Sequence, residues 1–126
     1  MSEEIGASAA TTGLFLHGRA ERLATRIVNA DSLPTTISWY RIPPAGMCTY
    51  HVHSGKDECW LIVAGSGRAR VGDDHYDVGP GDFLVTHEGT PHSLVNTGET
   101  PLTFFNIVYP TGTGAISSRE IPGDGP

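Results

Sequence analysis

The chain has 126 residues and a formal net charge of −6, and it contains 16 glycines and 9 prolines. This length suits one domain with a single core, and the glycines and prolines favour short strands joined by tight turns over long helices. The negative charge argues against nucleic acid and against an anionic membrane as partners, because the summed field repels both.

No apolar run reaches the roughly 18 residues that a membrane-spanning helix needs. The N-terminus carries Glu3 and Glu4, whereas a signal peptide starts with a basic region followed by an apolar one. We therefore expect a cytoplasmic protein. Residues 1–12 are small and polar, and they are predicted to form a flexible arm.

The predicted domain covers residues 13–110. It opens with two short apolar segments, 14–16 and 23–28, which suit edge strands or part of a dimer contact. Residues 35–42, TTISWYRI, are rich in β-branched and aromatic side chains. This composition indicates a strand, which the two prolines that follow would end.

The stretch from Gly46 to Gly65, GMCTYHVHSGKDECWLIVAG, holds the strongest chemical signal. Same-face neighbours on a strand lie about 6–7 Å apart, so one strand can aim the imidazoles of His51 and His53 at a common point. After the polar turn, the next strand can add the carboxylate of Glu58. Two imidazoles and a carboxylate suit divalent iron, manganese, nickel or zinc, although His-x-His alone is a weak signal that also arises by chance.

The rest of the domain reads as short strands bounded by Gly, Pro and Asp. They are expected at residues 68–71, 75–78, 83–86, 93–95 and 102–109. A loop before the fourth of these strands carries a third histidine, His92. Such close spacing predicts an all-β sandwich or barrel with no room for crossover helices. Residues 111–126 lack periodicity and are predicted to form a tail or a lid.

Two motifs in this chain resemble those of the cupin family. The first, G-x5-H-x-H-x3,4-E-x6-G, is matched, with four residues instead of five after the first glycine, by Gly46, His51, His53, Glu58 and Gly65. The second, G-x5-P-x-G-x2-H-x3-N, is matched by Gly81, Gly89, His92 and Asn96. His87 stands where the family usually has proline. Together the two motifs are specific, and the likeness covers about residues 37–110.

The resemblance implies a jelly-roll β-barrel built from two antiparallel sheets. It implies that one divalent transition metal, with Fe(II) favoured and Mn, Ni or Zn as alternatives, is bound by His51, His53, Glu58 and His92. It also implies a homodimer, since cupins often pair or exchange edge strands.

The resemblance also assigns residues around the metal. It places Tyr40 inward, and Tyr40 and His87 are the candidates for a general acid or base, because an unperturbed imidazole titrates near about pH 6.5. Phe104 and Asn106 share the inward face of the last strand, and with Trp60 they are assigned to a substrate pocket. Core packing for Phe104 and a solvent-exposed turn position for His87 are the simpler alternatives.

The remaining histidines and cysteines receive no ligand role. His17 is interpreted as a surface or interface residue, and His75 as a solvated residue beside a turn. Counted along regular strands, Cys48 and Cys59 face away from the ligands. Packing is therefore their predicted role, and a disulfide is disfavoured in a reducing cytoplasm.

Three histidines and one glutamate leave one or two positions of an octahedral ion open, as in a catalytic site. With one carboxylate bound, a dication keeps a charge of about +1 and attracts anionic, oxygen-chelating small molecules. The first hypothesis is an oxygenase acting on a small carbonyl, enol or phenolic substrate. The alternatives are a non-oxidative isomerase, cyclase or lyase acting on a sugar acid or a polyketide-like compound, and a non-catalytic binding module. No G-x-S-x-G turn or phosphate loop supports a serine hydrolase or a nucleotide enzyme.

Overall fold

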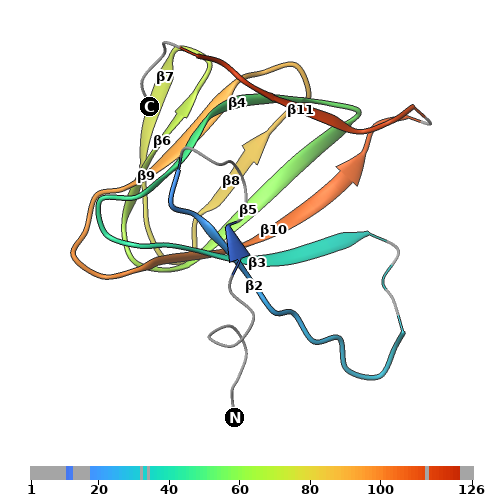
Figure 1. The fold of residues 1–126 in the computed structure, drawn as a ribbon, viewed down its shortest axis with the longest axis horizontal. Helices are drawn as coiled ribbons and strands as arrows, with labels where there is room; N and C mark the ends of the chain where they lie inside the picture. Colours follow the sequence, from blue (N-terminus) through green and yellow to red (C-terminus); the bar gives the residue numbers. More distant parts are fainter. Residues whose placement is uncertain (1–10, 13–17, 32, 34, 113, 123–126) are drawn as a thin grey trace.

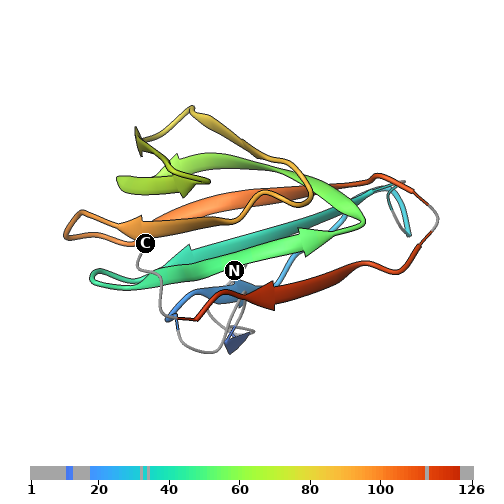
Figure 2. The same cartoon turned by 90° about the horizontal axis from the view of Figure 1, so that it is seen from above.

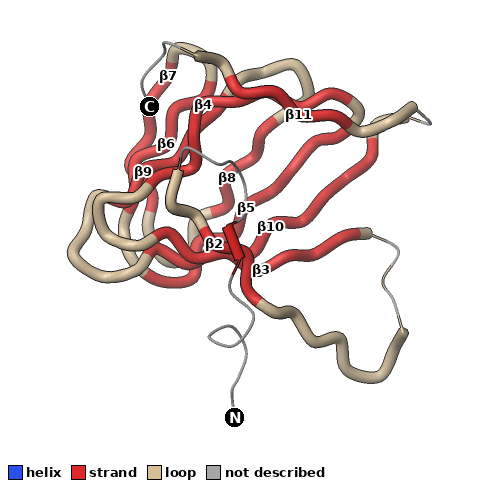
Figure 3. Tube along the Cα trace, in the orientation of Figure 1, coloured by secondary structure: helices blue, strands red, loops and turns tan. Residues whose placement is uncertain are grey.

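Strands and turns make up the whole of the chain that the structure, a computed structural model, describes: residues 11–12, 18–31, 33, 35–112 and 114–122. Figure 3 shows strands joined by loops, without a helix in these residues. Accordingly, no helix among them is long and apolar enough to cross a membrane.

The strands form two antiparallel sheets that face each other across the core (Figure 1). The six-stranded sheet contains, in spatial order, β1 (Thr11–Thr12), β2 (Glu21–Leu23), β3 (Thr36–Ile42), β10 (Leu102–Pro110), β5 (Lys56–Ala64) and β8 (Phe83–Thr86). The five-stranded sheet contains β11 (Ser117–Glu120), β4 (Met47–Ser54), β9 (His92–Asn96), β6 (Gly67–Val71) and β7 (Asp74–Val78). Figure 2 shows the long strands lying side by side along the molecule. The predicted all-β architecture of two antiparallel sheets is confirmed.

Alternation along the strands decides which side chains enter the barrel. In β10 every second residue is buried, from Leu102 through Phe104 and Asn106 to Val108. The neighbouring β5 buries Glu58, Trp60 and the residue two further on in the same way. The apolar core collects these inward side chains from both sheets: Ala20, Tyr40, Ile42, Cys48, Trp60, Ile62, Ala69, Leu84, Leu94, Leu102 and Phe104.

Strand β4 breaks this alternation. Its pairing with β9 shifts register between Cys48 and His51, which marks a β-bulge. As a consequence Tyr50 and His51, adjacent in sequence, are both buried. The bulge changes the phase of the strand, so that Cys48 on one side of it and His51 and His53 on the other all enter the interior.

Both ends of the chain contribute strands. Within the predicted arm, Thr11–Thr12 forms β1 and pairs with β2, and residues 1–10 lie outside the described residues. Residues 14–16 and His17 lie outside them too. Within the predicted tail or lid, β11 pairs with β4. The division into an arm, a barrel and a tail remains a prediction.

Gly65 makes the turn between β5 and β6 in the left-handed region, with φ of 89°. A Cβ atom there would lie 2.6 Å from the carbonyl oxygen of Pro101 and 2.8 Å from the Cα of Leu102. Both are backbone atoms, which cannot rotate away. The glycine is therefore required by its conformation and by the close approach of the loop before β10.

We expect Gly65→Ala to destabilise the fold by about 2 kcal/mol or more, since it adds left-handed strain to a backbone clash. Gly79→Ala is the matched control, because no atom lies within 4 Å of a Cβ at that position. Denaturant unfolding of the two variants measures the difference. Equal midpoints for both would contradict this account of the turn.

Candidate metal centre

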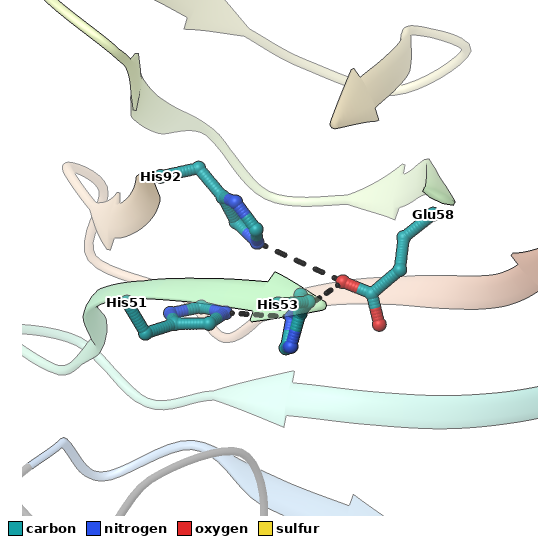
Figure 4. A group of neighbouring side chains, drawn as sticks. All are labelled: His51, His53, Glu58 and His92. Carbon is teal, nitrogen blue, oxygen red and sulfur yellow. Dashed lines mark hydrogen bonds and ion pairs between the residues drawn. The ribbon is translucent and has the colours of Figure 1, made fainter. Parts of the chain in front are cut away.

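Three strands bring the four motif residues together (Figure 4). His51 and His53 lie on β4 beyond the bulge, and Glu58 lies on β5 after the hairpin. His92 is the first residue of β9 and is the register partner of His51. The candidate ligands of the two motifs, which are far apart in sequence, thus lie together inside the barrel.

The loop between β8 and β9 is tied to the β4–β5 hairpin, and this fixes His92 relative to the other three residues. The amide of Gly89 donates to the carbonyl oxygen of His53 at 2.9 Å. The amide of Glu88 donates to Asp57 Oδ1 at 2.9 Å, and its carboxylate accepts from the Gly55 amide at 2.9 Å. Reciprocal hydrogen bonds of this kind hold the loop without regular strand pairing.

The four side chains are buried, and each offers one ligand atom within 4.8 Å of the others. Nε2 of His51 and Nε2 of His53 lie 3.1 Å apart. Oε1 of Glu58 lies 3.0 Å from Nε2 of His53 and 3.7 Å from Nε2 of His92. Three ring nitrogens and one carboxylate oxygen therefore surround one point.

Hydrogen bonds on the outer side of the cluster decide which ring nitrogens face inward. Nδ1 of His51 lies 2.5 Å from the carbonyl oxygen of Thr49, and Nδ1 of His92 lies 3.1 Å from that of Thr90. A carbonyl oxygen only accepts, so Nδ1 carries the hydrogen in both rings. In the neutral imidazoles Nε2 then keeps its lone pair, as a metal ligand must.

The third histidine is oriented from the C-terminal strand. Nδ1 of His53 lies 2.6 Å from the hydroxyl oxygen of Ser118, which can accept the ring hydrogen. Ser118 is the register partner of His53 in the pairing of β11 with β4. It lies 65 residues further along the chain, and nothing in its local sequence indicated this contact.

The spacing of the four atoms fits a transition-metal ion. Ligands held about 2.1 Å from one ion lie about 3 Å apart at right angles and about 4.2 Å apart across it. Three of the six separations among the four atoms, 3.0, 3.1 and 3.7 Å, fall in this range, and all six lie within 4.8 Å. Within the described structure, the buried atoms Glu58 Oε1 and His92 Nε2 also lack a hydrogen-bond partner. A cation at the centre would satisfy both.

Glu58 is held as a carboxylate. Burial acts to raise the pKa of its carboxyl, but hydrogen bonds from the His53 and His92 rings, when their Nε2 atoms are protonated, and the Lys56 ammonium lower that pKa below its usual range. Its other oxygen, Oε2, accepts a hydrogen bond from Nδ2 of Asn106 at 2.9 Å and lies 3.0 Å from Nζ of Lys56. Oε1 is thereby turned toward the histidines.

Cys48 does not face away from the ligands, which corrects the expectation from regular alternation. Its Sγ lies 3.7 Å from Nδ1 of His51, on the outer side of that ring. The bulge in β4 is the reason, because it shifts the phase between the two residues. Burial raises the pKa of the Cys48 thiol well above its usual value, so it packs as a neutral group. Cys48 and Cys59 are both free cysteines.

The residues assigned to a substrate pocket lie inside the barrel. Trp60 and Phe104 are fully buried, and their rings stack with centroids 4.7 Å apart. The rings of Trp60 and His92 meet in a T-shaped arrangement, with centroids 5.5 Å apart. Asn106 holds Glu58, as described above. Trp60 and Asn106 thus contact the cluster and Phe104 packs on Trp60, and the contact of these residues with a substrate remains a prediction.

The two candidates for acid–base chemistry lie in different surroundings. Tyr40 faces inward and stacks on Phe104, with centroids 5.6 Å apart, and burial raises the pKa of its phenol. The His87 side chain is 71% exposed, and its Nδ1 lies 3.3 Å from Oδ2 of Asp57 on the hairpin. Where the family usually has proline, this chain thus adds one more tie between loop and hairpin. A catalytic role for either residue remains a prediction.

Burial changes steadily along the barrel interior. On β5, Ile62, Trp60 and Glu58 are 0%, 0% and 1% exposed, and Lys56 is 14% exposed. On the paired strand β10 the interior likewise opens toward Val108, which is 8% exposed. The inward face of β5 thus becomes more exposed toward the end formed by the β4–β5 hairpin, which we call the mouth.

The metal-free protein should lose stability as the pH falls from about 6.5 toward 3. Burial, followed by the neighbouring His92, lowers the pKa of His51 to about 3. Between these values the unfolded chain binds a proton that the folded chain does not. The lowered pKa of Glu58 acts in the same direction at the acid end.

Thermal unfolding of chelator-treated protein at about pH 7.5 and about pH 5 tests this, and the midpoint should be lower at pH 5. In His51→Gln, which cannot titrate at this position, the drop should be smaller. A midpoint at pH 5 equal to or above that at pH 7.5 would contradict the assignment of His51 as a buried neutral imidazole.

Several known proteins are similar to this chain in sequence or in fold. An oxalate-binding protein of Thermotoga maritima is 31% identical over 68 residues, which are 54% of this chain and 56% of that protein. The chain spans about half the length of the curated relatives it matches. The structure of a predicted oxalate decarboxylase from Thermotoga maritima superposes with a TM-score of 0.68 at 23% identity, covering 85% of this chain and 98% of the other.

A cupin-2 domain from Rhodospirillum rubrum gives a TM-score of 0.64 at 18% identity, covering 93% of this chain and 70% of the other. At these identities the likeness shows the fold, a cupin-type barrel. The family model of the cupin domain matches residues 38–108, more than half of the chain, and contains all four residues of the cluster. The chain therefore belongs to the cupin domain family.

Proposed function

We propose that this protein binds one divalent transition metal through His51, His53, Glu58 and His92, and uses it as a centre for a small anionic substrate. The convergence of three imidazole nitrogens and one carboxylate oxygen in a buried site carries this proposal. The donor set suits Fe(II), which we favour, with Mn, Ni and Zn as alternatives. When bound, such an ion supplies a Lewis acid and, for iron or manganese, redox chemistry.

The residues of the chain favour a small, oxygen-chelating anion. With Glu58 as the one charged ligand, a dication keeps a charge of about +1. Trp60 and Phe104 close the interior beneath the cluster, so a substrate has to be small and to enter from the mouth. Relatives named for oxalate support the same class of ligand. A small dicarboxylate such as oxalate is therefore the first compound to test.

An oxygenase acting on a small carbonyl, enol or phenolic compound is our first candidate, because three nitrogens and one oxygen suit Fe(II). The second is a non-oxidative isomerase, cyclase or lyase, acting on a sugar acid, a polyketide-like compound or a small dicarboxylate. The structural likeness to a predicted oxalate decarboxylase favours the lyase. In that reaction carbon dioxide leaves, a proton takes its place, and no oxidant is consumed.

A non-catalytic binding module is the third candidate, and the relative named an oxalate-binding protein favours it. All three candidates bind a small ligand inside the barrel, but only the two enzyme candidates need the metal centre. They differ in what happens to the ligand once it is bound.

Homodimerisation and a cytoplasmic location stay predictions. For the dimer, support comes from apolar side chains on the outer face of the six-stranded sheet. Phe83 and Val85 on the edge strand β8 and Val63 on β5 are 67%, 49% and 42% exposed. A second copy of the chain would cover such a face, as isologous contacts do.

We expect the wild-type protein, purified without chelator or reloaded with Fe(II), to carry about one metal ion per chain. His51→Ala and His92→Ala should lose most of it, since each removes a ligand atom. His75→Ala is the matched control, because His75 is exposed on β7. Elemental analysis gives the answer, and equal metal contents in the three variants would overturn the ligand assignment.

Oxygen dependence separates the candidate reactions. An oxygenase loaded with Fe(II) should consume dioxygen with its substrate and stop under strict anaerobiosis. Full turnover without dioxygen, or with redox-inert Zn, would rule out the oxygenase and favour the lyase or isomerase. For a binding module we expect no turnover, and ligand affinity that survives removal of the metal would identify it.

A further inference from the structure

Lys56 is the only lysine in the chain, and it points into the barrel. It lies on β5 two residues before Glu58, so the two side chains share the inward face. Its side chain is 14% exposed, and it stands at the mouth, on the solvent side of the cluster. An ammonium group in such a place costs desolvation energy, which calls for a reason beyond packing.

The contact with Glu58 does not supply that reason by itself. Nζ of Lys56 lies 3.0 Å from Oε2 of Glu58. The same oxygen already accepts a hydrogen bond from Nδ2 of Asn106 at 2.9 Å. A neutral donor therefore orients the carboxylate, and the lysine adds charge more than geometry.

The Lys56 ammonium also has N–H donors that Glu58 does not use. A lysine carries three N–H donors, and within the described part of the chain the ion pair with Glu58 is the one polar contact of the Lys56 ammonium. Two donors can therefore face the solvent at the mouth. A carboxylate entering from that side would be the natural acceptor.

The summed charge of the site also favours an anionic ligand. A dication, the Glu58 carboxylate and the Lys56 ammonium add up to a charge of about +2, which a dianion would neutralise. The Glu58 carboxylate alone reaches from the histidines of the cluster to the ammonium: Oε1 lies 3.0 Å from Nε2 of His53, and Oε2 lies 3.0 Å from Nζ of Lys56. A diacid of two or three carbons is long enough to reach both.

We propose that Lys56 is the anion-recognition residue of this site, donating to one carboxylate of a small dicarboxylate or 2-oxo acid whose other oxygens face the His51, His53, Glu58 and His92 cluster. The inference rests on the proposed metal centre and deepens it by naming the substrate class. Lys56 would touch the substrate directly, and the contrasting possibility is that it only positions Glu58.

The test uses zinc-loaded protein and three acids, oxalate, malonate and acetate, with binding measured by calorimetry and metal content on the same samples. Lys56→Met removes the charge at similar length, and Lys56→Arg keeps it. Arg68→Gln is the charge-matched control, since Arg68 is exposed on β6. Thermal unfolding confirms that each variant is folded.

We expect Lys56→Met to keep its metal and to bind oxalate and malonate at least about tenfold more weakly, as loss of a charge-assisted hydrogen bond implies. Acetate should be affected less, Lys56→Arg should recover most of the affinity, and Arg68→Gln should match the wild type. Unchanged oxalate affinity in Lys56→Met would overturn the inference. Loss of metal and oxalate together would overturn it too, and would make Lys56 a positioning residue.

A second measurement needs no substitution. Labelling the protein with ¹³C-lysine gives a single Cε signal in the NMR spectrum, because Lys56 is the only lysine. Oxalate should shift this signal in the zinc-loaded protein, and an unmoved signal at saturating oxalate would overturn the inference. A wild-type protein that binds zinc but none of the acids would overturn it while leaving the metal centre intact. A wild-type protein that takes up no metal would overturn the centre itself, and the inference with it.

Discussion

The carboxylate of Glu58 inside the barrel is the constraint on which the rest of the structure depends. Removing such a charge from water costs several kcal/mol unless partners compensate for it. The partners come from four different strands: His53 from β4, His92 from β9, Asn106 from β10 and Lys56 from β5 itself. They meet around the carboxylate only when both sheets are in place. The polar centre therefore depends on the closed barrel. In turn, the barrel can hold the buried charge of Glu58 only because all of these partners surround it.

Much of this arrangement could be predicted because it depends on local rules. The period-two alternation put Phe104 and Asn106 on one face of β10, the resemblance to cupins turned that face and Glu58 inward, and the structure buries all three. Turn residues such as Gly65 indicated the hairpins, and two motifs with defined spacing identified the cluster. In each case the information lies within a few residues, where strand geometry leaves few alternatives.

Other features could not be predicted because they depend on contacts between distant segments. Counting along β4 failed at the bulge, which places Cys48 beside His51. The hydroxyl of Ser118 reaches His53 only because β11 pairs with β4. Lys56 is a different case: its inward direction follows from its place two residues before Glu58, yet its position in a polar turn hid it. A charged residue in phase with a buried ligand on the same strand therefore predicts a second charge on the inward face.

The pairing of β11 with β4 has a consequence for where this domain can be divided. The segment that matches the cupin domain, residues 38–108, contains all four cluster residues but stops before β11 (Ser117–Glu120). A protein trimmed to that segment would keep every ligand and lose the hydroxyl that orients His53. It would also make β4 an edge strand, paired with β9 on one side and open on the other, which invites association with other chains. The functional unit of this protein is thus larger than the stretch by which its family is recognised.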